Sequence, residues 1–389
     1  MQTLYSSILA FLVSLILSLM VGAAEEKKVE EKKEETPKIQ VIPGFADKIT
    51  ITGFVQLQYT TSTVDDAVSN SFEIRRARIG AIANFNDWIT GRFELDGAPN
   101  KDGTQPGILR DAFLNVGFEP GFQLKLGQYK KPFSVVQLIA DTAYPTVERG
   151  IRLQGVGQKA LDNLLQALRY NERDIGITVL GSFKDLLGKG TNISYQVGVF
   201  NGEGLNKFDI NNGKQIVGRV VVTPLKGLDL AADFVNNTLN GDPIRDSSGN
   251  AVDSTNVQAF GFDVQYRPNS EQGLWLIGEV DFGDNFDNPS GGFLRGDKTA
   301  TFVGFTTVVA YRIPVQNTKR LVAFEPVFRV DFTDPNREVG DDGATLITPA
   351  FNLYFQKNVR LMFDYDIVKP QDSHKETESG FLFRAQVIY

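Results

Sequence analysis

The stretch that decides the fold is Phe381-Leu-Phe-Arg-Ala-Gln-Val-Ile-Tyr389. One parity is entirely apolar and ends on an aromatic residue: Phe381, Phe383, Ala385, Val387 and Tyr389. The other parity includes Arg384 and Gln386. Because successive side chains of a strand point to opposite faces, this alternation predicts a strand with one apolar and one mixed face. Such a strand either closes a barrel in a membrane or ends a soluble sandwich, and the rest of the sequence distinguishes the two.

Composition excludes several classes of function. The sequence has no cysteine and a single histidine, His374, so it offers neither a thiolate metal site nor most triad chemistry. Its formal net charge of −7 does not suit a nucleic-acid binder. We therefore expect no cofactor and no nucleic-acid partner. The 29 Phe and 11 Tyr favour strands and the aromatic girdles of membrane barrels.

The N-terminal residues divide into two segments before any strand. Residues 1–23 are the predicted signal peptide. Their apolar run, from Leu4 to Ala23, leads into Val21-Gly-Ala-Ala24, which suits a signal-peptidase site after Ala23 or Ala24. The run lacks a preceding Lys or Arg, which leaves an uncleaved membrane anchor as the alternative. Residues 24–48 are rich in Glu and Lys, and we expect a solvated periplasmic leader there. Residues 49–389 then form one domain.

From Ile49 onward the hydrophobic period is two, and about sixteen strands are expected, an even number as in porins. The predicted runs are 49–59, 77–85, 89–96, 112–118, 122–129, 175–183, 193–200, 216–223, 228–234, 260–266, 274–282, 303–311, 322–332, 351–355, 359–367 and 381–389. Short turns such as Asn86-Asp87 alternate with long polar loops such as 240–256 and 283–298. This alternation is the architecture of an all-β, antiparallel, up-and-down transmembrane barrel.

The charged parity of the strands supports a water-filled lumen. In Val322–Phe332 the apolar parity alternates with Glu325, Arg329 and Asp331. Charges in the dry core of a sandwich would each cost several kcal/mol unless paired, whereas a lumen tolerates them and lipid takes the apolar parity. A barrel of about sixteen strands is wide enough for such a lumen. We therefore expect an exported protein of the bacterial outer membrane, in contact with its lipid.

One insertion, between Lys130 and Glu172, is much longer than the other loops. Leu161, Leu164, Leu165 and Leu168 follow helical spacing, so we expect this third loop to fold into the lumen and narrow the pore. With its flanks it carries seven basic and five acidic residues. The predicted constriction residues are Lys130, Lys131, Arg149, Arg152 and Lys159. The alternative is an extracellular flap with a solvated charged surface.

A second basic segment is Phe72-Glu-Ile-Arg-Arg-Ala-Arg-Ile79. Counted from the apolar parity that begins at Ala77, Arg76 and Arg78 face the lumen. Arg75 takes the lipid-side parity, which places it beyond the hydrocarbon band. By the same parity, the predicted pore-lining residues are Arg76, Arg78, Arg219, Arg329 and Arg384.

These segments resemble the phosphate-selective porin family (types O and P). The resemblance is carried, in the family's order, by Phe72–Ile79, Leu109-Arg-Asp-Ala-Phe113, Gly127-Gln-Tyr-Lys-Lys-Pro-Phe-Ser134, Glu148-Arg149, Arg173-Asp-Ile-Gly176, Phe200-Asn-Gly202, Gly218-Arg219 and Glu325-Pro326. It implies a homotrimeric outer-membrane porin of sixteen strands whose third loop enters the lumen. It also implies that Arg76 and Arg78 line the vestibule and that Lys130 and Lys131 bind an anion such as phosphate at the constriction.

The sequence also departs from that pattern, because the inward parity is rich in acids: Glu94, Asp96, Asp111, Asp233, Asp263, Glu279 and Asp281. A general, weakly selective porin is therefore an alternative to passive diffusion of small anions, and a barrel plugged by its own loop is another. An enzyme is not expected, since His374 has only Asp372 and Ser373 beside it in the sequence.

Overall fold

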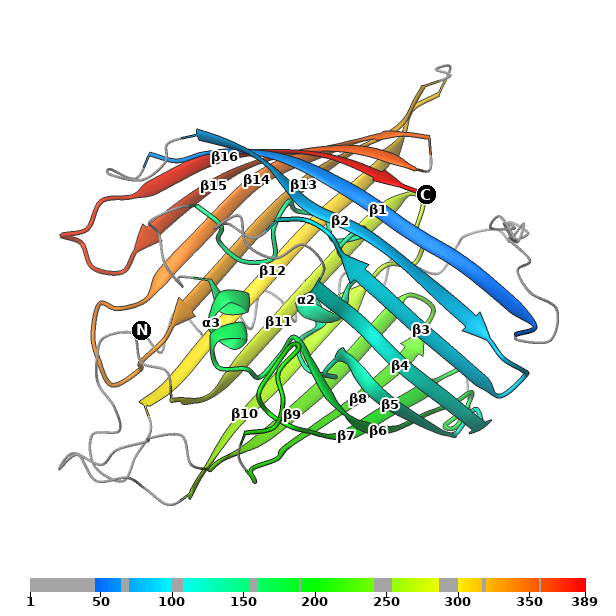
Figure 1. Cartoon of the computed structure of the whole chain (residues 1–389). Helices are drawn as coiled ribbons and strands as arrows, with labels where there is room; N and C mark the ends of the chain where they lie inside the picture. The colour runs from blue at the N-terminus through cyan, green and yellow to red at the C-terminus, as the bar shows by residue number, and fades with distance from the viewer. Residues whose placement is uncertain are drawn as a thin grey trace. The chain divides into compact units, whose positions relative to one another are not determined.

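The computed structural model describes residues 46–63, 70–99, 108–153, 160–188, 190–210, 212–240, 254–286, 300–316, 320–356 and 358–389. In these residues, sixteen antiparallel strands form one closed up-and-down barrel (Figure 1). The first eight strands are β1 (Lys48–Thr61), β2 (Asn70–Asn84), β3 (Ile89–Asp96), β4 (Ile108–Glu119), β5 (Phe122–Lys130), β6 (Arg173–Phe183), β7 (Asn192–Phe200) and β8 (Gln215–Leu225). The others are β9 (Leu228–Asn240), β10 (Ser254–Tyr266), β11 (Gly273–Asn285), β12 (Ala300–Pro314), β13 (Leu321–Asp334), β14 (Ala344–Phe355), β15 (Val359–Pro370) and β16 (Glu378–Ile388). The predicted fold class and strand number are confirmed. The signal segment and most of the leader lie outside the described residues and remain predictions.

The C-terminal strand closes the barrel. β16 pairs with β1, and Tyr389 extends the seam by two backbone hydrogen bonds with Gly53. The Gly53 N–H donates to the Tyr389 carbonyl at 3.1 Å, and the Tyr389 N–H donates back at 3.0 Å. Closure removes the unpaired strand edges that lipid could not satisfy.

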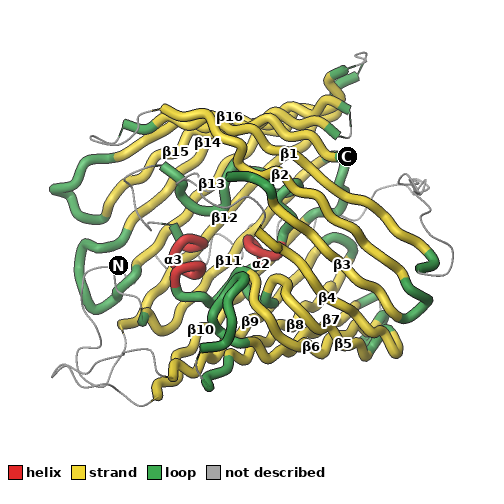
Figure 2. The backbone as a smooth tube through the Cα atoms, in the orientation of Figure 1, coloured by secondary structure: helices red, strands yellow, loops and turns green. Residues whose placement is uncertain are grey.

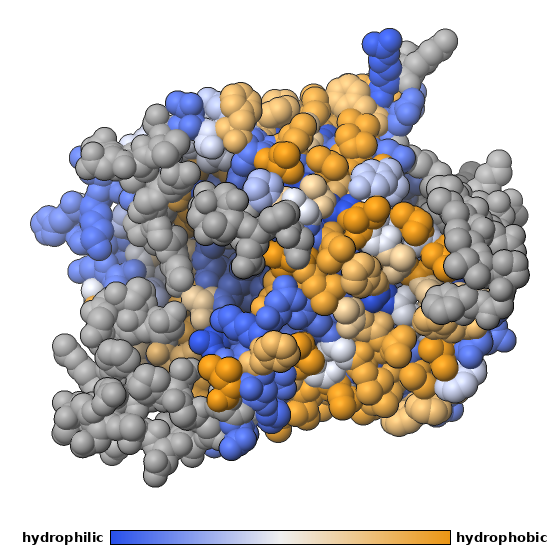
Figure 3. Space-filling model, in the orientation of Figure 1, coloured by the Kyte–Doolittle hydropathy of each residue, from blue (hydrophilic) through white to orange (hydrophobic). Residues whose placement is uncertain are grey.

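Alternation along each strand separates an apolar exterior from a polar interior. On β13, Phe328 is 48% exposed, while its neighbour Arg329 is 1% exposed and points inward. Apolar residues gather over the outside of the strands (Figure 3). Among the described residues, no helix is both long and apolar enough to cross a membrane.

The strands extend further than the predicted runs at the ends that carry the long loops. β14 begins at Ala344 instead of Phe351, and β2 begins at Asn70 instead of Ala77. At these ends polar residues, such as Asn70 and Ser71, join the strand, so the contrast between the two parities fades. The hydrophobic pattern therefore marks the apolar band of the barrel and not the full length of each strand.

The third loop, between β5 and β6, lies inside the barrel (Figure 2). Its described residues include two short helices, α2 (Val135–Leu138) and α3 (Leu161–Ala167), so the predicted helical spacing and inward course are confirmed. The loop packs on the inner wall through three apolar clusters. The α3 leucines share one buried cluster with inward residues of β8, β9, β10 and β12, such as Val235 and Phe302. Each buried leucine contributes about 1.5–3 kcal/mol, so the loop is held by more than its charges.

One position in the family-like segments is glycine for a steric reason. Gly127 on β5 has φ of 129°, where L side chains are strained, and it lies against the neighbouring strand β4. A Cβ there would lie 2.2 Å from the carbonyl oxygen of Ala112. Only glycine allows β4 and β5 to pair this closely just before the third loop begins.

Candidate functional site: the loop and wall constriction

A β-bulge in β2 turns two adjacent arginines toward the lumen. Gln56 of β1 lies opposite Arg76, but Leu57 lies opposite Ile74, so Arg75 is an extra residue in the pair. A bulge of this kind redirects side chains by breaking the strict alternation. The expectation that Arg75 lies on the lipid side is therefore wrong. The signal was present, since apolar Phe72 and Ile74 switch parity relative to Ala77.

Arg75 reaches Glu148 of the third loop. Its Nε and Nη2 donate to the two carboxylate oxygens at 2.7 and 3.1 Å. Arg384 of β16 donates to the same carboxylate at 2.5 Å, and Arg76 lies 3.8 Å from it. Burial alone would raise the pKa of Glu148, but these guanidinium groups hold it well below its ordinary value.

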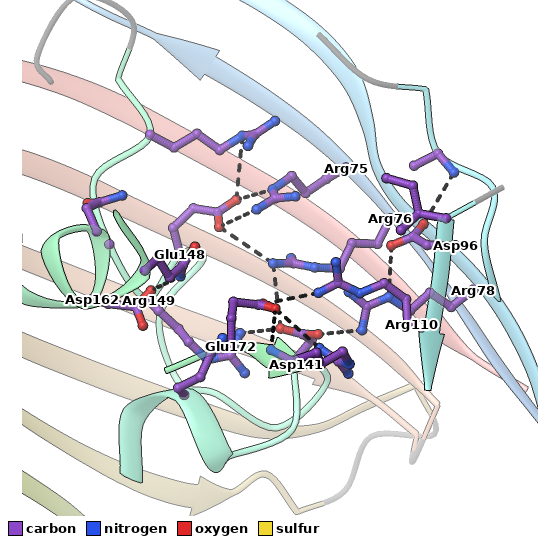
Figure 4. Close-up of a pocket in the computed structure, with 18 of the residues that line it drawn as sticks. Arg75, Arg76, Arg78, Asp96, Arg110, Asp141, Glu148, Arg149, Asp162 and Glu172 are labelled. Carbon is purple, nitrogen blue, oxygen red and sulfur yellow. Dashed lines mark hydrogen bonds and ion pairs between the residues drawn. The ribbon is translucent and has the colours of Figure 1, made fainter. Parts of the chain in front are cut away.

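Asp141, earlier in the loop, is a second hub. Arg78 donates to its carboxylate at 2.6 Å, Arg76 lies 3.5 Å away, and Arg149 forms a further ion pair. Burial would raise the pKa of Asp141, but Arg149, Arg76 and Arg78 hold it well below its ordinary value. The loop acids Asp141 and Glu148 therefore join the loop to the arginines of β2, as Figure 4 shows.

A cavity of about 360 Å³ lies between the loop and strands β2 to β6. Of the described residues that line it, eight are basic and five acidic, a formal excess of three positive charges. The basic residues are Arg75, Arg76, Arg78, Arg110, Lys130, Arg149, Arg152 and Arg173. The acidic residues are Asp96, Asp141, Glu148, Asp162 and Glu172. We call Arg75, Arg76, Arg78 and Arg110 the arginine wall; Arg110 belongs to the Leu109–Phe113 segment, where sequence alone gave it no role.

The two predicted constriction lysines have different surroundings. Lys130 lines the cavity, and its Nζ donates to the carbonyls of Gln137 and Ile139. Lys131 is completely buried, and its Nζ donates to the Arg169 carbonyl at 2.5 Å and to Gln215 Oε1 at 2.6 Å. Burial lowers the pKa of Lys131 to about 8. Lys131 therefore fastens the base of the loop and does not line the cavity.

The remaining predicted residues occupy several positions. Arg152 lines the cavity and pairs with Glu73 at 2.8 Å. Arg219 lies away from the cavity, 2.6 Å from both Asp233 and Asp263. Arg329 pairs with Asp331 at 2.7 Å and donates to the Glu148 carbonyl. Lys159 lies outside the described residues.

The inward acids of the opposite side bind the backbone of the loop. Asp233 accepts from the Ser134 N–H at 2.9 Å, and Glu279 accepts from the Val136 N–H at 2.8 Å. Two further loop N–H groups donate in the same way: Val147 N–H to Asp364 at 2.6 Å and Leu161 N–H to Asp331 at 3.0 Å. We call Asp233, Glu279, Asp331 and Asp364 the acid wall. Leaving such buried N–H groups unpaired would cost about 1–3 kcal/mol each, so these acids dock the loop.

Within the part of the chain that the structure describes, no group of three or more His, Asp or Glu residues could hold a metal ion. His374 is exposed in the connection between β15 and β16, and its backbone N–H donates to Asp372 Oδ1 at 2.9 Å.

A closed sixteen-stranded barrel with an apolar exterior and an inserted loop defines an outer-membrane porin. The profile of the family described as phosphate-selective porin O and P matches residues 49–389, and the chain belongs to this family. Fold and family therefore indicate a channel in the bacterial outer membrane and not an enzyme.

Solved structures share the fold at low sequence identity. The anion-selective porin from Comamonas acidovorans is 15% identical, with a TM-score of 0.59 over 88% of this chain and 99% of its own. Salmonella typhi OmpF, solved with daunomycin, is 15% identical, with a TM-score of 0.62 over 90% of this chain and 99% of its own. The trimer form of Vibrio cholerae OmpT is 14% identical, with a TM-score of 0.53 over 88% of this chain and 100% of its own. No curated protein matches the chain.

Proposed function

We propose that this porin conducts small anions, phosphate among them, by passive diffusion through the gap between the third loop and the arginine wall. The observation that carries the proposal is the formal excess of three positive charges around the cavity. Pore rings of Arg and Lys raise the local concentration of anions and oppose cations. The name of the Comamonas porin and the family description agree with this direction.

The acids of the lumen do not cancel this excess in the proposed mechanism. Asp141 and Glu148 each contact at least three guanidinium groups, so cations outnumber carboxylates where loop and wall meet. The acid wall is engaged with backbone N–H groups of the loop on the far side. An anion passing the cavity therefore meets mainly N–H donors.

Specific roles follow for the predicted residues. The residues that would contact the passing anion are Arg76, Arg78, Lys130, Arg149 and Arg152. Lys159 is proposed to join them. Arg384 would position Glu148. Lys131, Arg219 and Arg329 would support the loop and the lumen wall without touching the anion.

We also propose that the porin is a homotrimer in outer-membrane lipid, as the trimer form of OmpT suggests by analogy. Sedimentation of the purified protein in detergent checks this. A mass of three chains is the expected result, and a single chain would contradict it.

The experiment that tests the function is planar-bilayer recording of the purified protein in a KCl gradient, followed by added phosphate. We expect small, anion-preferring conductance steps that phosphate blocks. Large steps that prefer cations and ignore phosphate would instead identify a general porin. No steps at all would identify a plugged barrel.

A further inference from the structure

The carboxylate of Glu148 lies at the cavity as an anion that the chain itself supplies. Arg75 binds it side-on, with its Nε and Nη2 donating to the two carboxylate oxygens at 2.7 and 3.1 Å (Figure 4). This edge of a guanidinium group presents two parallel N–H groups, which bind the paired oxygens of a carboxylate or of a phosphate group in the same geometry. Glu148 therefore occupies a position that also fits an oxyanion from solution.

The cavity gives a solute access to this ion pair. Arg75 and Glu148 both line the cavity of about 360 Å³. The side chain of Arg75 is 20% exposed, and that of Arg152, 4.0 Å from the same carboxylate, is 23% exposed. An anion in the cavity can therefore reach Arg75 without entering the barrel wall or the buried side of the loop.

The charges around Glu148 attract a second anion. Four guanidinium groups lie within 4.0 Å of its carboxylate, those of Arg75, Arg76, Arg152 and Arg384. Two of the four also pair with other acids, Asp141 and Glu73. These four cations exceed the three carboxylates by one, so an incoming anion is drawn toward the pair.

Glu148 keeps a partner if Arg75 leaves it. Arg384, whose side chain is only 2% exposed, donates to the same carboxylate at 2.5 Å. The backbone carbonyl of Glu148 accepts from Thr146 Oγ1 at 2.8 Å and from Arg329 Nη1 at 3.0 Å. Because a buried charge without a partner is strongly destabilising, the contact with Arg384 lowers the free-energy cost of an exchange at Arg75.

The other loop acid in contact with β2, Asp141, is more enclosed. The side chains of its described arginine partners, Arg76, Arg78 and Arg149, are 4 to 9% exposed. The Arg75–Glu148 pair is therefore the more accessible of the two attachments between loop and wall.

We propose that Glu148 is a built-in competitor for the anion site of the pore. A solute oxyanion takes its place on Arg75 while Glu148 stays on Arg384, and the return of Glu148 to Arg75 then displaces the solute. The proposal rests on the anion pore proposed above and concerns the regulation of that same site. Internal competition weakens binding and speeds release, and a conducting site must release its ion.

The test is a double-mutant cycle of Arg75 and Glu148, measured as the block of chloride current by phosphate in planar bilayers. Glu148→Gln removes the competing charge at nearly constant size, so phosphate should block at about tenfold lower concentration, and each block should last longer. Arg75→Gln should raise the blocking concentration. In the Arg75→Gln background Glu148→Gln should add little, because the contested guanidinium is absent. Additive effects of the two changes would overturn the proposal.

The matched control is Glu73→Gln. It removes the same charge from a carboxylate that pairs with Arg152 at 2.8 Å, and Glu73 is not among the described residues that line the cavity. We expect a much smaller change in the blocking concentration than for Glu148→Gln. Equal shifts in the two variants would show a general charge effect and overturn the proposal.

Crystals of the whole protein soaked in arsenate provide a readout that does not depend on conduction. We expect an anomalous peak beside Arg75 Nε and Nη2, with Glu148 still within hydrogen-bond distance of Arg384. An intact Arg75–Glu148 pair, whether arsenate is bound elsewhere or absent, would overturn the proposal.

The two proposals fail in different ways. A wild-type pore that prefers cations would contradict the anion function. An anion-preferring pore that phosphate blocks equally in wild type and in Glu148→Gln would contradict only the role of Glu148 as a competitor.

Discussion

The two sides of the lumen carry opposite charges and use them differently. The arginine wall on β2 and β4 faces the cavity, whose lining has eight basic residues and five carboxylates. The acid wall on β9, β11, β13 and β15 faces the buried side of the third loop and accepts its backbone N–H groups. The comparison teaches that the charge of a lumen is not the sum of its inward residues, because a docked loop removes one side from the solute path.

The largest effect is expected from reversing one charge of the arginine wall. Arg78→Glu changes the local charge by two and places a new carboxylate near Asp141. We expect the anion-to-cation permeability ratio to fall about tenfold or more, since such focused charge sets local ion concentrations over this range. Reversal potentials in a KCl gradient measure the ratio. The matched change Arg320→Glu, on an exposed turn, should leave it nearly unchanged, and equal shifts would contradict the assignment.

A smaller effect distinguishes the two constriction lysines. Lys130→Met should lower the permeability ratio for anions a few-fold, because it removes one cation from the cavity. Lys131→Met should leave the ratio unchanged but destabilise the barrel by about 1–3 kcal/mol, because the Arg169 carbonyl and Gln215 lose a buried donor. Paired recordings and unfolding titrations measure both. A selectivity change in Lys131→Met alone would reverse the two roles.

The acid wall should respond to loss of its acceptor more than to loss of its charge. Asp364→Ala removes the acceptor for the Val147 N–H, at a cost of about 1–3 kcal/mol to loop docking, so open-channel noise should increase. Asp364→Asn removes the charge but keeps an oxygen, so it should remain close to wild type. If both variants raise anion preference equally and neither adds noise, the carboxylate acts on the solute and not on the loop.

The smallest expected effect is a pH dependence at the cavity. Burial raises the pKa of Asp162 to about 6, although Arg149 opposes this. Asp162 is therefore charged at pH 7.5 and mostly neutral at pH 5. Its protonation removes one negative charge, so the net charge of the cavity lining becomes more positive by one. Anion preference should rise as the pH falls through 6, and Asp162→Asn should remove that component. An identical pH profile in the variant would exclude Asp162 as its source.

The fold could be predicted from the sequence because lipid and water impose opposite demands on alternate residues. All sixteen predicted runs lie within or overlap strands of the barrel, and the leucine spacing identified α3. The orientation of Arg75 was missed because one bulge residue reverses parity, and strict alternation contains no such step. The role of the acid wall could not be predicted, since no local pattern tells which side of the lumen the loop covers.

The ion pair between two family-like segments, Phe72–Ile79 and Glu148-Arg149, could likewise not be predicted from the sequence. Glu148 of the Glu148-Arg149 pair binds Arg75 of β2, whereas Arg149 turns to Asp141. The Arg75–Glu148 contact joins residues 73 positions apart, and parity within a strand carries no information about a partner in a loop. Tertiary docking, and not local sequence, determines which charges remain available to the solute.

The measurement that tests this account most directly is anomalous diffraction from crystals soaked in RbBr, which locates anions and cations in one lumen. The account predicts bromide in the cavity beside Arg78 and Arg110 and no rubidium along the acid wall. Rubidium bound at Asp233, Glu279 or Asp364, with an empty arginine wall, would contradict it.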